Sequence, residues 1–206
     1  MELFAPPPIL RSFLCALVQG IWGHRLDFSQ AQRIDKTYVL PDYRKSESDI
    51  LYQIPYQNRD AFVYILLEHQ STVDFLMPFR VLFYIVQIWW DYVKQDLDRA
   101  KQQDFRLPPI FPVVLYTGPG GWSGEREFVE LVEGGQEFLP RLPNFRLEVL
   151  EVSRLGEAEL GEFGSVLGAI FLLEQGFHSV QEGEARFYKA REHLGEVGEL
   201  LGAILR

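Results

Sequence analysis

The chain has 206 residues, of which 47% are apolar and 14% aromatic, enough for a sizeable hydrophobic core and unlike a disordered protein. Its single cysteine, Cys15, excludes an intrachain disulfide and a cysteine-based zinc site, and suits a reducing, cytoplasmic setting. The net charge is −9, with 12 Lys and Arg against 13 Asp and Glu in residues 1–107, and 8 against 16 in residues 108–206. Long-range attraction to phosphates is therefore weak, so any binding of nucleic acid must be local, metal-assisted, or helped by a partner or further segment.

The first predicted element is a helix over residues 9–22, where apolar residues recur at three- and four-residue spacing. The stretch contains Arg11 and Gln19 and is too short to cross a bilayer. It also lacks the basic region that opens a signal peptide. We therefore expect an amphipathic helix here and no membrane segment.

Three strands are predicted next, the first a short one over residues 37–40. Residues 49–54 alternate weakly between apolar and polar side chains and end before Pro55. Residues 61–68 form a near-continuous apolar run, which is typical of a strand buried on both faces. Because the polar segment between these last two strands is short, they should pair as a hairpin.

A long crossover helix is predicted over residues 74–101. Its apolar face is expected to consist of Phe75, Phe79, Leu82, Phe83, Val86, Trp90 and Val93. The remaining elements are a buried strand over 110–116, a helix near 125–132, a strand near 145–152, and two helices over 157–175 and 183–205. This order implies an α/β fold with a mixed sheet, in which the strands before and after the crossover helix are parallel and central.

Polar residues stand at one end of the predicted hairpin. Asp49 begins one strand and Glu68 ends its partner, and Gln70 shares the face of Glu68 if the strand continues that far. Two carboxylates and an amide would then converge into an all-oxygen site of the kind that Mg²⁺ or Mn²⁺ prefers. The same residues also fit a strand that simply ends where it meets water.

Several segments resemble one bacterial family. They are Ser48–Tyr52 (SDILY), Ile65–Ser71 (ILLEHQS), Met77–Arg80 (MPFR) with Tyr84, and Leu107–Gly118 (LPPIFPVVLYTG). Over about residues 9–150 the chain resembles the recombination-promoting nucleases, which are also classed as transposases of the PD-(D/E)xK nuclease superfamily. The resemblance implies a restriction-endonuclease-like mixed sheet flanked by helices.

The resemblance also implies roles for individual residues. Asp49 and Glu68 would be metal ligands, and Gln70 would stand where the superfamily usually has a catalytic lysine. Glutamine can orient the attacking water but brings no positive charge to the transition state, so slower chemistry is expected.

Arg80 and Tyr84 are expected on the polar side of the crossover helix, one turn apart. Arg80 would reach a phosphate or the Glu68 carboxylate. An ion pair between Arg80 and a nearby acid, with a purely structural role, is the alternative.

The expected activity is Mg²⁺-dependent hydrolysis of DNA phosphodiesters, linked to recombination or mobile elements. Residues 1–155 would form the nuclease-like domain, and residues 156–206 a helical extension that packs on it or mediates self-association into a homo-oligomer. Two alternatives remain open. One is a catalytically decayed member that binds or regulates, favoured by the acidic charge and the missing lysine. The other is an oligomerising interaction protein that acts through its C-terminal helices.

Overall fold

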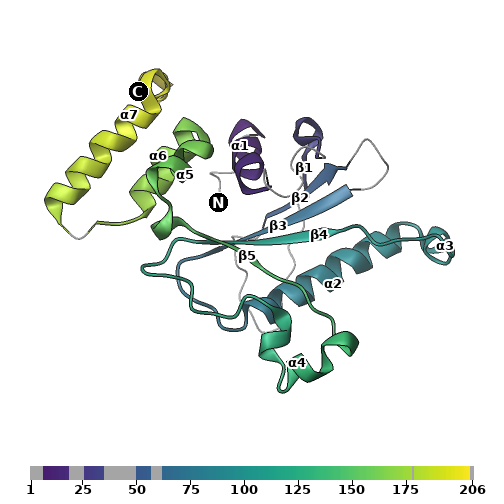
Figure 1. Ribbon diagram of the computed structural model, residues 1–206. Coiled ribbons are helices and arrows are strands. Elements are labelled where there is room, and N and C mark those ends of the chain that lie inside the picture. Colours follow the sequence, from purple (N-terminus) through teal and green to yellow (C-terminus); the bar gives the residue numbers. More distant parts are fainter. Residues whose placement is uncertain (1–6, 19–25, 35–49, 57–61, 178, 205–206) are drawn as a thin grey trace. The chain divides into compact units, whose positions relative to one another are not determined.

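A computed structural model of the chain describes residues 7–18, 26–34, 50–56, 62–177 and 179–204 (Figure 1). The chain forms two compact units. The sheet unit comprises Arg25–Leu115 and Trp122–Leu150, and the helical unit comprises Met1–His24, Tyr116–Gly121 and Glu151–Arg206. The predicted division into domains at residue 155 stays a prediction. In the described part of the chain, no helix is long and apolar enough to cross a membrane.

The sheet unit is built on five strands whose spatial order follows the sequence. They are β1 (Gln32–Ile34), β2 (Ile50–Pro55), β3 (Phe62–Gln70), β4 (Ile110–Tyr116) and β5 (Glu148–Glu151). The α/β class is confirmed. Strand β1 was not expected, because three residues with two polar side chains give no periodic signal. The strand predicted over residues 37–40 lies outside the described residues.

Strands β2 and β3 form the predicted hairpin. They pair antiparallel, with Ile50 opposite Leu67 at one end of the ladder and Pro55 opposite Phe62 at the other. Residues from both faces of β2 are buried, which fits an internal strand with β1 and β3 on either side. Strand β3 continues two residues beyond its predicted end and stops at Gln70.

Helix α2 (Met77–Gln95) connects β3 to β4, and both strands are internal in the sheet, as predicted. Figure 1 shows α2 running along one face of the sheet. A helical crossover between neighbouring strands is the usual connection of a parallel pair, and the direction of β4 relative to β3 stays a prediction.

The face that α2 buries is not the predicted one. Arg80 is 5% exposed and Tyr84 2%, whereas Phe79 is 49% exposed. The buried face consists of Met77, Pro78, Arg80, Val81, Tyr84, Ile85 and Ile88. Apolar side chains occupy nearly every side of this helix, so that two stripes have helical spacing, and periodicity alone could not decide which of them faces the sheet.

The helix predicted over residues 74–101 is also divided. Asp96 has non-helical backbone angles (φ −147°, ψ 87°), and its carboxylate accepts a hydrogen bond of 2.8 Å from the backbone N–H of Arg99. Asp96 thereby caps a separate short helix, α3 (Leu97–Ala100). The helix expected near 125–132 is a 3₁₀ turn (Phe128–Leu131), followed by α4 (Gly135–Phe138).

The helical unit contains α1 (Pro7–Val18), α5 (Glu157–Glu162), α6 (Gly164–Glu174) and α7 (Val180–Ile204). The single helix predicted over 157–175 is broken at Gly164, whose φ of +81° is outside the helical region. The Phe13 ring of α1 lies 6.0 Å from the Phe163 ring and 6.3 Å from the Phe171 ring, measured between centroids. These aromatic contacts join α1 to the C-terminal helices in one core. Residues 19–22 of the predicted first helix lie outside the described residues.

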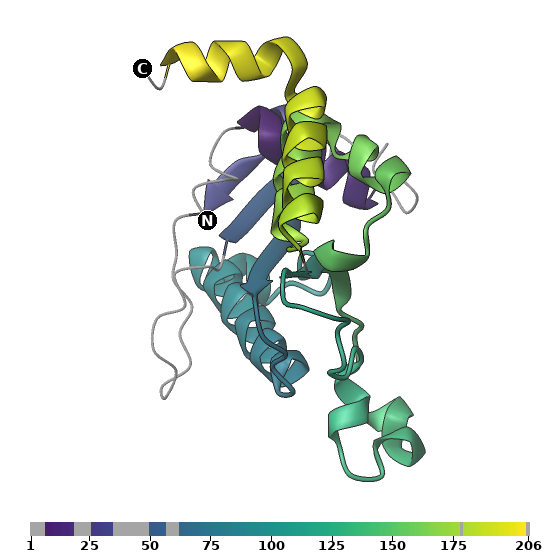
Figure 2. The ribbon, with the colours of Figure 1, turned by 90° about the vertical axis from the view of Figure 1, so that its left-hand side faces the viewer.

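Helix α7 is kinked at Gly195, whose backbone angles (φ 44°, ψ −132°) are not helical. Figure 2 shows the two segments of α7 running in different directions. The segment before the kink, from Val180 to Leu194, packs on α6.

Candidate functional site

The predicted carboxylate site falls at the end of the hairpin where β2 begins and β3 ends. Strand β3 stays extended through Gln70, so positions 68 and 70 have the two-residue spacing that places residues on one side of a strand. The strand therefore continues as far as Gln70, which was the condition for placing Gln70 on the same face as Glu68. At this end the ladder's last pair joins Ile50 to Leu67. Asp49 lies outside the described residues, and the approach of its carboxylate to that of Glu68 stays a prediction.

The connection from β3 to α2 is held by Asp74. One carboxylate oxygen, Oδ1, accepts a hydrogen bond of 2.9 Å from the backbone N–H of Leu76. The other, Oδ2, lies 2.8 Å from Nη1 of Arg80. The backbone N–H of Met77 also donates to the carbonyl of Asp74, at 3.1 Å. A side-chain oxygen that accepts from the backbone N–H two residues later forms an Asx turn. Asp74 therefore both stabilises the turn and pairs with Arg80.

Arg80 uses a second nitrogen to reach Tyr84. Its Nη2 donates to the Tyr84 hydroxyl at 3.3 Å, one helical turn further on. Both side chains are buried, while Asp74 remains partly exposed at the edge of the cluster. A guanidinium out of water needs a carboxylate and further acceptors, and Asp74 and Tyr84 accept from its Nη1 and Nη2 atoms.

The structure therefore brings together two of the predicted supporting residues, Arg80 and Tyr84. Arg80 pairs with Asp74, so an ion pair with a nearby acid is present, and contact of Arg80 with the Glu68 carboxylate or a phosphate stays a prediction. Asp74 was missed as a functional residue. Its signal was present, because an aspartate just before a helix is a common turn and capping residue.

A second pair of acids lies in the sheet unit, at Glu125 and Glu130. A hydrogen bond with the Glu130 side chain, together with the negative charge of that group, raises the pKa of Glu125. The Glu130 carboxylate also accepts hydrogen bonds from the backbone N–H of Glu127 at 3.1 Å and of Arg126 at 3.3 Å. Glu130 is the third residue of the 3₁₀ turn Phe128–Leu131 and caps the start of that turn through Glu127, and these bonds account for its position without a ligand.

Among the residues that the structure describes, no three His, Cys, Asp or Glu side chains gather into a group that could hold a metal ion. Asp49 is not among them, so the predicted metal site is not tested by this observation.

A family model described as "Putative transposase, YhgA-like" matches residues 2–187, most of the chain. The chain belongs to this YhgA-like family. No solved structure matches the chain, and a restriction-endonuclease-like core stays a prediction.

Several relatives of this YhgA-like chain are recombination-promoting nucleases by name. RpnD of Escherichia coli O157:H7 is 30% identical over 90 residues, which is 42% of this chain and 32% of RpnD. RpnA of Escherichia coli K12 is 26% identical over 112 residues, 54% of this chain and 36% of RpnA. RpnE of the same strain, named an inactive nuclease-like protein, is 24% identical over 119 residues, 57% of this chain and 33% of RpnE. The matches thus span about a third of each relative's length.

Proposed function

We propose that this YhgA-like chain is a metal-dependent DNA endonuclease with a restriction-endonuclease-like core. It would act in recombination or on mobile elements, in the bacterial cytoplasm. Membership of a family whose relatives are named recombination-promoting nucleases carries the proposal. The continuous extended course of β3 to Gln70 supports it, because it gives positions 68 and 70 a common side.

The proposed site adds one residue to the ladder between β2 and β3. If the antiparallel register continues one step beyond Ile50 and Leu67, Asp49 comes opposite Glu68. Residues directly opposite in an antiparallel pair point to the same face, with Cβ atoms about 4.5–5.5 Å apart. Two carboxylates and the Gln70 amide would then face one point.

This donor set fits a hard divalent cation, because all of its ligand atoms are oxygens. Bound there, Mg²⁺ or Mn²⁺ would lower the pKa of a water molecule and neutralise charge on the phosphoryl oxygens. Binding of the cation and orientation of the water would depend on the chain's own residues. Asp49 and Glu68 hold the cation, and Gln70 orients the water with its side-chain amide. Since Gln70 carries no charge, cleavage should be slower than in enzymes with lysine at this position.

Arg80 and Tyr84 have a supporting role in this proposal. The ion pair between Arg80 and Asp74 fixes the turn that leaves β3, only four residues after Gln70. A rigid turn there would hold the end of β3 in one position. The Arg80 guanidinium is buried and already pairs with Asp74, so it would have to bind Asp74 and a phosphate at the same time to contact DNA directly.

The decisive experiment is cleavage of supercoiled plasmid by the purified chain with Mg²⁺, Mn²⁺ or EDTA. We expect nicked or linear product with either metal and none with EDTA. Asp49→Ala and Glu68→Ala, prepared in parallel, should both abolish the product. The proposal fails if the wild type leaves supercoiled, linear and single-stranded DNA uncut at every metal concentration, or if both variants cut as well as the wild type.

A catalytically decayed, DNA-binding member is the second candidate. Gln70 in place of lysine favours it, and one relative, RpnE, is named inactive. The net charge of −9 makes such binding depend on local contacts. Retention of a labelled duplex without cleavage, equal in Mg²⁺ and EDTA and unchanged by Glu68→Ala, would support this candidate over the nuclease.

A further inference from the structure

The helical unit has an exposed apolar surface along α7 and the end of α6. Phe187 is 59% exposed and Tyr188 63%, and exposed Leu173, Phe177 and Val180 lie beside them around two adjoining pockets. Contiguous exposed aromatic side chains are uncommon on a monomer surface and mark sites of association. This set of five residues is called the α7 surface below.

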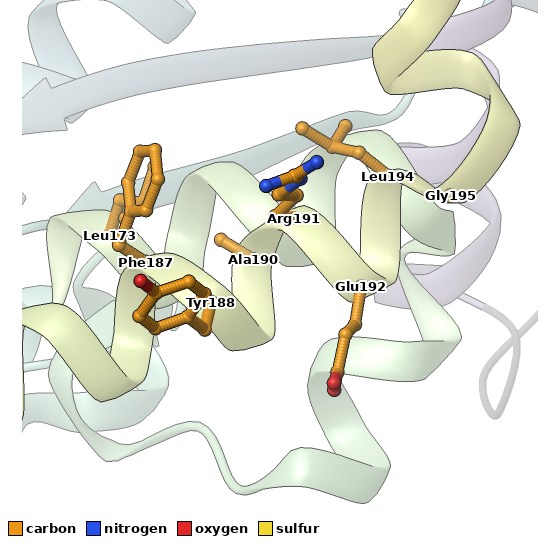
Figure 3. A pocket seen from close by; sticks show the side chains of 8 residues that line it. All are labelled: Leu173, Phe187, Tyr188, Ala190, Arg191, Glu192, Leu194 and Gly195. Carbon is orange, nitrogen blue, oxygen red and sulfur yellow. The ribbon is translucent and has the colours of Figure 1, made fainter.

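Two opposite charges frame the aromatic pair on α7. Glu184 lies three residues before Phe187, and Arg191 lies three residues after Tyr188. Glu184 and Arg191 are seven residues apart, so they differ by only about 20° around a helix and form the centre line of one face. Phe187 and Tyr188 flank that line on either side. Figure 3 shows Phe187 and Tyr188 on different sides of the helix, with Arg191 further along it.

The other Lys and Arg side chains of this segment are paired within the unit, whereas Glu192 is exposed and lies about 100° around the helix from Arg191, off the line through Glu184 and Arg191. Arg186 binds Glu182 at 2.9 Å, and Lys189 binds Glu157 of α5. Among the described residues, Glu184 and Arg191 form no ion pair with one another or with a neighbour. Both are exposed, next to the aromatic pair.

We propose that the α7 surface is the interface of a homodimer, in which α7 of one protomer pairs antiparallel with α7 of a second copy. The two-fold axis would pass between Phe187 and Tyr188. Glu184 of each protomer then faces Arg191 of the other, which makes two equivalent ion pairs on either side of an aromatic centre. An isologous interface requires a self-complementary surface of this kind.

The charge order is what selects a second copy as the occupant. A negative group before the aromatic pair and a positive group at the same distance after it are matched by the same helix reversed. Burial of Phe187 and Tyr188 would supply most of the affinity, because buried aromatic side chains dominate interfaces. The ion pairs would set the register and the antiparallel direction. The dimer is independent of the proposed nuclease activity.

The first test measures the mass of the full chain by light scattering and sedimentation over a range of protein concentrations. We expect a reversible dimer, weakened about 30-fold or more by Phe187→Asp, the effect of removing a central aromatic contact. Phe138→Asp is the matched control, because Phe138 is an aromatic residue of the sheet unit with a similar exposure of 52%. It should dimerise like the wild type. Circular dichroism verifies that both variants are folded.

A charge exchange tests the register. Glu184→Arg places two like charges together at each end of the interface, as does Arg191→Glu, and each variant should dimerise about tenfold more weakly. The double variant E184R/R191E restores opposite charges across the axis and should recover wild-type affinity. Nonspecific association of apolar surfaces would not show this recovery.

Each of the following results would overturn the proposal. A wild type that stays monomeric at all accessible concentrations leaves the α7 surface to a different partner. A monomer whose melting temperature falls in Phe187→Asp indicates that another part of the same chain covers it. A dimer that persists in Phe187→Asp, or a double variant that stays as weak as the single ones, places the interface elsewhere or in another register.

Discussion

Arg80 lies with its Nη1 atom 2.8 Å from Oδ2 of Asp74, and this ion pair joins the turn after β3 to the buried face of α2. Arg80 lies on the buried face of α2, six residues along the chain from Asp74. Since a buried charge without its partner is strongly unfavourable, the pair constrains both elements together.

 The first prediction follows from this pair. Asp74→Ala should lower the free energy of unfolding by about 3 kcal/mol, because the buried Arg80 loses the Asp74 carboxylate and the N–H of Leu76 loses its acceptor. Asp98→Ala is the control, since Asp98 pairs with Lys101 on the surface and its side chain is 94% exposed. That change should cost less than about 1 kcal/mol. Urea denaturation of both variants makes the comparison, and equal, small losses would mean that the Asp74–Arg80 pair does not hold the turn.

A second prediction concerns two glycines of the helical unit. A Cβ at Gly168 would lie 2.5 Å from the carbonyl oxygen of Leu160, whereas a Cβ at Gly161 would meet nothing within 4 Å. Gly168→Ala should therefore destabilise the protein by about 1–3 kcal/mol through overpacking between α5 and α6. Gly161→Ala should leave stability unchanged or raise it by up to about 1 kcal/mol, because alanine favours helix. Thermal denaturation distinguishes the two, and a stabilising Gly168→Ala would contradict the close approach of the helices.

The third prediction tests metal binding without relying on activity. Divalent metal at 100 times its dissociation constant stabilises the folded state by about 2.7 kcal/mol, so Mg²⁺ or Mn²⁺ should raise the melting temperature of the wild type by about 5–10 °C. Glu68→Ala should show much less of this increase, and Glu137→Ala, an exposed acid of α4, should keep it. Equal stabilisation of the wild type and Glu68→Ala would place any bound metal elsewhere.

Much of the sheet unit could be predicted from the sequence, because its strands carry strong signals. The apolar run of β4 has the same bounds in the sequence and in the structure, and the hairpin of β2 and β3 follows from two apolar segments with a short polar link. Helix breaks were harder to predict. Asp96 and Gly164 each interrupt a continuous helical pattern through local backbone geometry, which apolar periodicity does not report.

The candidate site was predictable in its residue types but not in its contacts. The pattern showed that Arg80 and Tyr84 are one turn apart, and in the structure Nη2 of Arg80 donates a hydrogen bond to the Tyr84 hydroxyl. It did not show which side of α2 they occupy, since that helix is apolar on most of its surface and the sheet decides which stripe it covers. The acid that pairs with Arg80 comes from the turn before the helix, and only the folded turn brings it within reach.

The last prediction compares Gln70→Lys with Gln70→Ala in the plasmid assay. If Gln70 orients the attacking water, lysine should retain that role and add a positive charge near the developing negative charge on the phosphate. Cleavage by Gln70→Lys should therefore equal or exceed that of the wild type. Loss of one such stabilising group typically lowers the rate about 10²–10³-fold, so plasmid cleavage by Gln70→Ala should be close to background.

Metal saturation and a blank variant make this comparison interpretable. Lysine at position 70 could pair with Glu68 and weaken metal binding, in which case activity falls at low Mg²⁺ and returns when Mg²⁺ is saturating. Asp49→Ala serves as the blank, because it removes a proposed ligand and leaves position 70 unchanged. Gln70→Ala cleaving as fast as the wild type at saturating metal would remove Gln70 from the site. Full cleavage by Asp49→Ala as well would show that the nuclease activity belongs to a contaminant or to another part of the chain.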